Sequence, residues 1–135
     1  ESRAFQNCVN LEEISLPKGL RVLERGVFLG CTGLWYVELP DKLKEIEDWA
    51  FGGCTSLKGI ELPEEIESIG IHSFQKEGVR SGEGYEIQIY CREGTKTWEL
   101  LQDEKYEGKW KMWKKREDYV IEYYFKRKDN RVKWG

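Results

Sequence analysis

The sequence predicts an α/β repeat fold: a solenoid with a parallel β-sheet, a C-terminal capping helix and a small antiparallel β tail. Three observations lead to this prediction. Apolar residues recur with a period of 23 over the first two thirds of the chain, a strand and helix outside the period follow, and the last 28 residues alternate aromatic with basic residues. A single coil cannot bury its own apolar face, so neighbouring coils must cover it.

Each repeat carries the pattern F-x-x-C-x-x-L-x-x-[IV]-x-L-P-x-x-[LI]-x-x-[LI], which starts at Phe5 and occurs three times without a gap. The alternation of Ile14 and Leu16 predicts a short strand with one face turned inward. The proline that follows ends the strand because it has no N–H to donate. The segment Leu20–Leu23 then crosses the back of the coil, and a helical turn at the phenylalanine leads into the next strand.

Cysteine occupies one fixed position of the repeat, at Cys8, Cys31 and Cys54. This register favours small buried side chains that stack from coil to coil over disulfides or a metal site. Neither a CxxC pair nor a histidine cluster is present, since His72 is the one histidine. We therefore expect neither a metal nor another cofactor.

These residues closely resemble the BspA-like class of leucine-rich repeat, whose units read L-x-x-I-x-L-P-x-x-[LIV]-x-x-I-G-x-x-A-F-x-x-C. The resemblance covers residues 2–74 and departs from the pattern at Glu24, Glu47 and Glu77. It implies a leucine-rich-repeat solenoid, and it implies the setting of a bacterial cell-surface or secreted protein that contacts host or matrix proteins. The chain opens at Glu1 in the middle of a unit, so we expect further repeats upstream.

We expect two parts, a solenoid with its cap over residues 1–107 and a tail over 108–135 packed on that cap. The last strand of the solenoid should be Tyr85–Tyr90, and Thr95 should begin a helix of about twelve residues. Solenoids need such a cap to cover the final coil.

The predicted tail is basic and aromatic. Residues 1–104 carry 11 basic against 20 acidic side chains, whereas residues 105–135 carry 11 against 5. Period-two alternation at Tyr119–Phe125 predicts an antiparallel hairpin. Basic residues interleaved with aromatics can stack on sugars or follow a polyanion, although no signature of a nucleic-acid-binding fold is present. The candidate tail surface comprises Trp110, Trp113, Tyr124 and Lys126.

The residue types argue against an enzyme, because the chain has one histidine, no Ser-His-Asp grouping and no phosphate-binding glycine loop. A non-enzymatic protein-interaction or adhesion module is the favoured function, with a structural end-cap or spacer, or a glycan- or polyanion-binding tail, as alternatives. No apolar run is long enough to span a membrane, and the open edge of the first strand invites self-association. The candidate partner-binding residues flank the inward positions of the strands: Glu13, Ser15, Trp35, Tyr36, Glu38, Glu61, Glu86 and Gln88.

Overall fold

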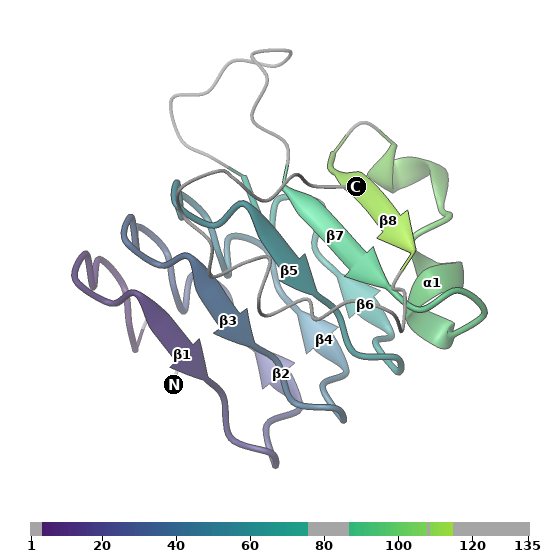
Figure 1. The fold of residues 1–135 in the computed structure, drawn as a ribbon, viewed down its shortest axis with the longest axis horizontal. Helices are drawn as coiled ribbons and strands as arrows, with labels where there is room; N and C mark the ends of the chain where they lie inside the picture. Colours follow the sequence, from purple (N-terminus) through teal and green to yellow (C-terminus); the bar gives the residue numbers. More distant parts are fainter. Residues whose placement is uncertain (1–3, 76–86, 108, 115–135) are drawn as a thin grey trace.

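The computed structural model describes residues 4–75, 87–107 and 109–114, with the backbone alone for Trp113 and Lys114. The chain winds into stacked coils whose strands form two parallel layers (Figure 1). We call the layer of five strands the front sheet, and it consists of β1 (Glu13–Ser15), β3 (Tyr36–Glu38), β5 (Gly59–Glu61), β7 (Gln88–Cys91) and β8 (Lys111–Lys114). The back sheet consists of β2 (Val22–Leu23), β4 (Glu45–Ile46) and β6 (Ser68–Ile69).

The front sheet confirms the parallel arrangement that the repeat predicts. Ile14 of β1 pairs with Val37 of β3, and Ile60 of β5 pairs with Ile89 of β7. Val37, Ile60 and Ile89 are 0–3% exposed and point into the solenoid. β5 packs beside β3, so that one layer continues across the coils (Figure 1). Equivalent repeat positions therefore lie next to each other in space.

The back sheet is a feature that the sequence did not predict, because the segment Leu20–Leu23 was expected only to cross the coil. Two residues of each coil pair with the next, as Leu23 does with Ile46 and Ile46 with Ile69. These three side chains are at most 3% exposed. A two-residue strand is too short for period-two alternation to reveal it, so the pattern alone could not distinguish it from a loop.

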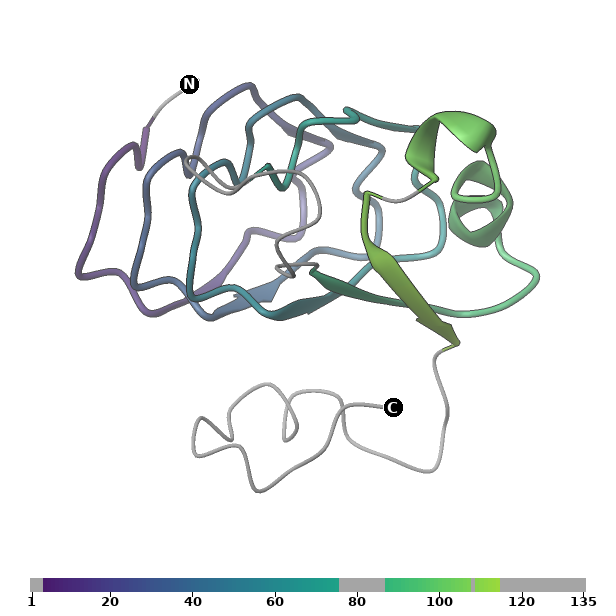
Figure 2. The same ribbon diagram turned by 90° about the horizontal axis from the view of Figure 1, so that it is seen from above.

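Stacked phenylalanines form the third side of the coils. The rings of Phe5, Phe28, Phe51 and Phe74 follow one another at centroid distances of 5.2, 5.4 and 5.3 Å, with interplanar angles of at most 14°. The segments that carry them are turns rather than the expected helical turns. Figure 2 shows these coils in projection, with the chain leading from one to the next. Ring stacking thus has the same period as strand pairing.

The cysteines beside this stack are thiols, as the register predicted. Cys31 and Cys54 are 0% exposed. The Cys31 Sγ–H donates to the Phe5 carbonyl at 3.0 Å, and the Cys54 Sγ–H donates to the Phe28 carbonyl at 3.2 Å. Each thiol therefore connects one coil to the coil before it.

The turn after each phenylalanine requires a left-handed backbone at a fixed repeat position. Gly53 has φ +69°, Gly30 has φ +77°, and the equivalent residue of the first coil, Asn7, has φ +60°. Glycine and asparagine are the residues that adopt this region at low cost. A Cβ at Gly30 would also collide with the side chain of Asn7.

The C-terminal closure confirms the last inward residues but corrects the helix. Ile87 and Ile89 are buried as predicted. The Thr95 side chain caps the helix by accepting a hydrogen bond from the Trp98 N–H. However, α1 spans only Lys96–Leu100 and is followed by a 3-10 helix at Glu104–Tyr106. The prediction of one helix of about twelve residues is therefore wrong.

The predicted tail begins with a strand, β8, that extends the front sheet. β8 pairs with β7 in the same direction, with Ile89 opposite Met112. The short helices return the chain to the start of the front sheet, and a crossover of a dozen or more residues is what a parallel pair requires. The predicted antiparallel pairing within the tail stays a prediction, because it concerns the pairing of this strand with Tyr119–Phe125. The remainder of the predicted hairpin lies outside the described residues.

Candidate functional site

The outward side of the front sheet collects most of the predicted partner-binding residues. Inward residues such as Val37 and Ile60 are buried, so their neighbours along each strand point away from the core. Strand pairing then sets Glu13 opposite Tyr36 and Ser15 opposite Glu38. Six of the eight predicted residues lie in β1, β3, β5 and β7, namely Glu13, Ser15, Tyr36, Glu38, Glu61 and Gln88.

The other two predicted residues stand apart from this arrangement. Trp35 directly precedes β3 and is half-buried, with its ring centroid 6.2 Å from that of Tyr36 at a tilt of 43°. The pair forms an aromatic step at the amino end of the strand. Glu86 lies outside the described residues.

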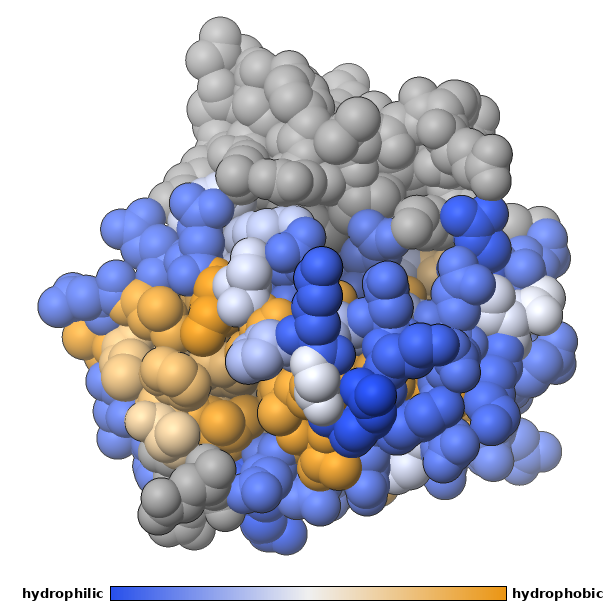
Figure 3. All heavy atoms as spheres, turned by 90° about the horizontal axis from the view of Figure 1, so that it is seen from below, coloured by the Kyte–Doolittle hydropathy of each residue, from blue (hydrophilic) through white to orange (hydrophobic). Residues whose placement is uncertain are grey.

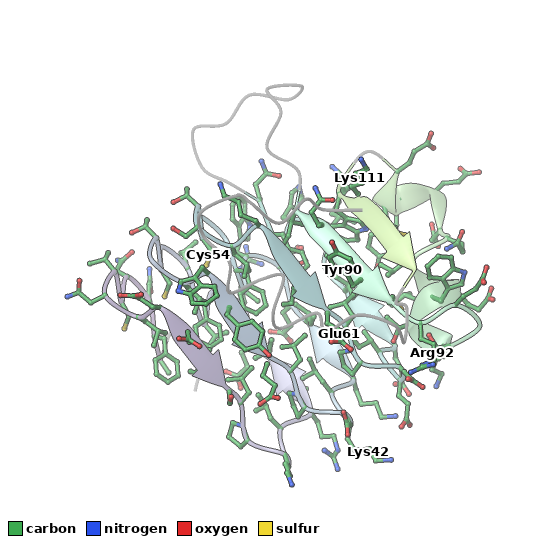
Figure 4. All side chains as sticks on the ribbon, in the orientation of Figure 1. Lys42, Cys54, Glu61, Tyr90, Arg92 and Lys111 are labelled. Atoms are coloured by element: carbon green, nitrogen blue, oxygen red, sulfur yellow. The ribbon has the colours of Figure 1, made fainter. Side chains whose placement is uncertain are left out.

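A groove of about 480 Å³ lies where β3 and β5 end. Tyr36, Glu38 and Glu61 line it, and these are three of the residues that the sequence singled out. Asp41 from the turn after β3 and Arg92 from the segment after β7 also line it. Figure 4 shows Glu61 on the sheet with Arg92 and Lys42 beyond the carboxyl ends of the strands. Residues of adjacent coils therefore line one groove.

The groove is acidic. Its lining contains five carboxylates and two bases, Lys42 and Arg92, both engaged with lining acids. Arg92 Nε lies 2.9 Å from Glu64 Oε2, and Lys42 Nζ lies 3.3 Å from Glu65 Oε2. These pairs are exposed to solvent, so each contributes little to stability. They nevertheless neutralise both bases and leave a local excess of negative charge.

Two lysines hold one of these carboxylates in its ionised form. Hydrogen bonds from Lys44 and Lys42, both at 3.3 Å, lower the pKa of Glu65. Glu65 therefore keeps its negative charge to a lower pH than an isolated glutamate. Glu65 thus contributes a negative charge to the groove throughout the neutral range.

The sequence analysis missed five charged lining residues, which lie after the strands and not within them: Asp41, Lys42, Glu64, Glu65 and Arg92. Four of them follow the Leu-Pro step of the repeat, within two residues of Pro40 or Pro63. The recurrence of charge at this position was visible in the sequence. That these charged residues lie beside the outward side chains of the strands became clear only from the stacking of the coils.

One residue of the predicted tail surface, Trp110, is buried. Trp110 is a core residue with 8% exposure, contacting the Phe74 ring edge-on at 5.8 Å and the Tyr106 ring at 5.1 Å. Its prediction as an exposed binding residue is wrong, because the chain turns inward before entering β8. The backbone of Trp113 pairs with that of Tyr90. Tyr124 and Lys126 lie outside the described residues.

Among the residues that the structure describes, no group of three or more His, Cys, Asp or Glu side chains is placed to hold a metal ion. His72 stacks on Trp49 with a centroid distance of 5.8 Å, and its backbone N–H donates to Asp48 at 3.0 Å. Its contacts thus belong to the stacking of coils. Within the same described part, no helix has the length and apolar character needed to cross a lipid bilayer.

The parallel coils, the buried leucine ladder and the outward-facing strand residues define a leucine-rich-repeat solenoid. The chain belongs to the BspA-type leucine-rich repeat family, whose six-copy region model matches residues 1–82. This confirms the resemblance drawn from the repeat pattern.

One solved structure with a similar fold is that of a leucine-rich cell surface protein from Faecalibacterium prausnitzii A2-165. It is 32% identical in sequence, with a TM-score of 0.56, and the match covers 67% of this chain. The same match covers 22% of that protein, so the matched part of this chain corresponds to about a fifth of its length. Among curated proteins, no significant match is found.

Proposed function

We propose that this chain is a non-enzymatic protein-interaction module of a bacterial surface or secreted protein, and that it binds through the outward side of its front sheet. The observation that carries the proposal is the acidic groove, where Tyr36, Glu38 and Glu61 from two coils converge. A partially exposed tyrosine beside carboxylates suits a partner segment that presents lysine or arginine. Family membership and the named surface protein support the setting at a cell surface.

The test is selection of peptides from a displayed library on the full chain, followed by affinity measurement with groove variants. We expect the selected peptides to be rich in basic residues. Tyr36→Ala or Glu61→Gln should weaken their binding by about tenfold, which is typical for the loss of an anchor residue. The matched control is Glu24→Gln, an exposed acid outside the groove. Equal loss in the control, or selection without basic peptides, would contradict the proposal.

A structural role at the end of the solenoid is favoured by the packing around Trp110. Tyr106 and Trp110 both contact the last coil, and the Tyr106 hydroxyl donates to the Ile69 carbonyl at 2.6 Å. We propose that residues 1–107 form the solenoid with its cap, and that 108–135 reinforce it. Removal of 108–135 should then lower the melting temperature by several degrees. An unchanged melting temperature would indicate that the tail instead binds glycans or polyanions.

Self-association is the remaining candidate role, and it involves the opposite end. Among the described residues, β1 pairs only with β3, and Phe5 and Val9 are 37% and 53% exposed. Figure 3 shows apolar side chains gathered over this end of the molecule, on the left. An open strand beside an apolar end can take another strand. Val9→Lys should reduce any dimer seen by sedimentation, and a monomer at all concentrations would refute this role.

A further inference from the structure

We propose that the acidic groove binds the chain's own segment 115–135, so that this segment and an external partner compete for the same surface. The inference rests on the proposed function in one respect, since it takes the same groove as the binding surface. It adds a specific occupant and therefore a means of regulation. Two observations carry it: the opposite charges of the two surfaces and the reach of the segment.

The charges of the two surfaces are opposite. The groove lining holds five acids against two bases, and those two bases, Lys42 and Arg92, are paired with acids of the same lining. The segment 115–135 carries seven basic and four acidic residues. Opposite potentials favour association and orient the segment toward the groove.

The direction of β8 brings the segment to the groove. Because β8 runs parallel to β7, the chain leaves Lys114 at the same edge of the front sheet where β3, β5 and β7 end. The groove opens at that edge. With adjacent strands about 4.8 Å apart, β3 lies about 15 Å from β8. Twenty-one extended residues can span up to about 70 Å, so the distance is no obstacle.

The composition of the segment suits docking on the front sheet. It contains an alternating apolar and aromatic stretch that can lie along β7, and a basic cluster that can reach the carboxylates of the groove. The apolar stretch comprises Tyr119, Ile121, Tyr123 and Phe125, and the basic cluster comprises Lys126, Arg127 and Lys128. Three residues of extended chain cover about 10 Å, so the two parts can engage β7 and the groove at the same time.

The experiment is limited trypsin digestion of the full chain, with cleavage at the basic cluster followed by mass spectrometry. A synthetic 115–135 peptide serves as the unprotected reference. We expect cleavage in the full chain to be at least about tenfold slower than in the peptide, because cleavage tracks the fraction of undocked segment. The double variant Glu38→Gln, Glu61→Gln should accelerate cleavage by about threefold to tenfold, and high salt should do the same. The control Glu24→Gln, Glu107→Gln alters two exposed acids outside the groove and should leave the rate unchanged.

Several results would overturn the inference. They are a cleavage rate equal to that of the peptide, protection that survives in the groove variant, and protection that depends on protein concentration, which would indicate docking between two copies. Circular dichroism of each variant at the assay temperature excludes unfolding as a cause of faster cleavage. No external partner takes part, so this test and the peptide selection can fail independently of each other.

Discussion

The phenylalanine stack offers the sharpest test of how the solenoid is stabilised. Phe51 is 1% exposed and lies between two parallel rings, at 5.4 Å from Phe28 and 5.3 Å from Phe74. Phe5 occupies the same repeat position in the first coil but is 37% exposed and has one ring neighbour, at 5.2 Å. The two sites thus differ in whether both faces of the ring are covered.

The structure predicts a large difference between the two alanine variants. Phe51→Ala removes a fully buried ring with two stacking partners and should cost about 3–5 kcal/mol of unfolding free energy. Phe5→Ala loses only partial burial and one partner, which corresponds to about 1–2 kcal/mol. Urea denaturation followed by circular dichroism measures both values. If Phe51→Ala does not fold, Phe51→Leu and Phe5→Leu provide the same comparison at lower cost.

The assay has a clear refuting outcome. Equal losses at the two positions would mean that ring stacking between coils contributes nothing beyond the burial of each coil. A larger loss for Phe5→Ala would mean that the first coil is covered in solution by another part of the chain or by a second copy.

Three further predictions concern buried polar groups. Thr97→Val should cost about 1–3 kcal/mol in urea denaturation, because the Thr97 hydroxyl accepts from one backbone N–H at 2.9 Å and donates to one carbonyl at 2.6 Å. Thr97→Ser should retain most of the stability, and equal losses would contradict this account. Cys54→Ala should cost about 1–2 kcal/mol, and the native thiol should react slowly with a labelling reagent until the protein unfolds; rapid labelling would exclude burial. Burial raises the pKa of the Cys31 thiol and of the Tyr106 hydroxyl. These groups ionise at lower pH in the unfolded chain than in the folded one, so the free energy of unfolding should fall as pH rises above about 8.5. Tyr106→Phe should make this fall less steep above about pH 10. A constant free energy of unfolding from pH 7 to 10.5 would refute the assignment.

The period of the sequence predicted most of the inward side of the fold. Ile60 and Leu57 could be placed in the core because the same positions are apolar in every copy, and both are 0% exposed. The same logic predicted Cys31 and Cys54 as buried thiols. Residues outside the period were predicted less well, because a segment that occurs only once has no equivalent copy with which its pattern can be compared. The length of the closing helix and the pairing of β8 with β7 belong to this group.

The candidate site was likewise predicted from the sequence only in part. Alternation within a strand identified Glu38 and Glu61 as outward, because side chains on a strand point to opposite faces. It could not identify Arg92, which comes from a different segment and reaches Glu64 across 28 residues of sequence. Contacts between segments depend on where the stacked coils place the ends of their strands.

The sequence alone determined the repeat, the inward residues and the coil-to-coil stacking. A short pattern that repeats in register buries its apolar side chains when the coils stack with equivalent positions next to each other. Only the tertiary structure decided the back sheet, the parallel entry of β8, the burial of Trp110 and the position of the acidic groove. Each of these depends on the path of the chain between elements, and that path is selected by packing and backbone hydrogen bonds over distances that no local pattern records.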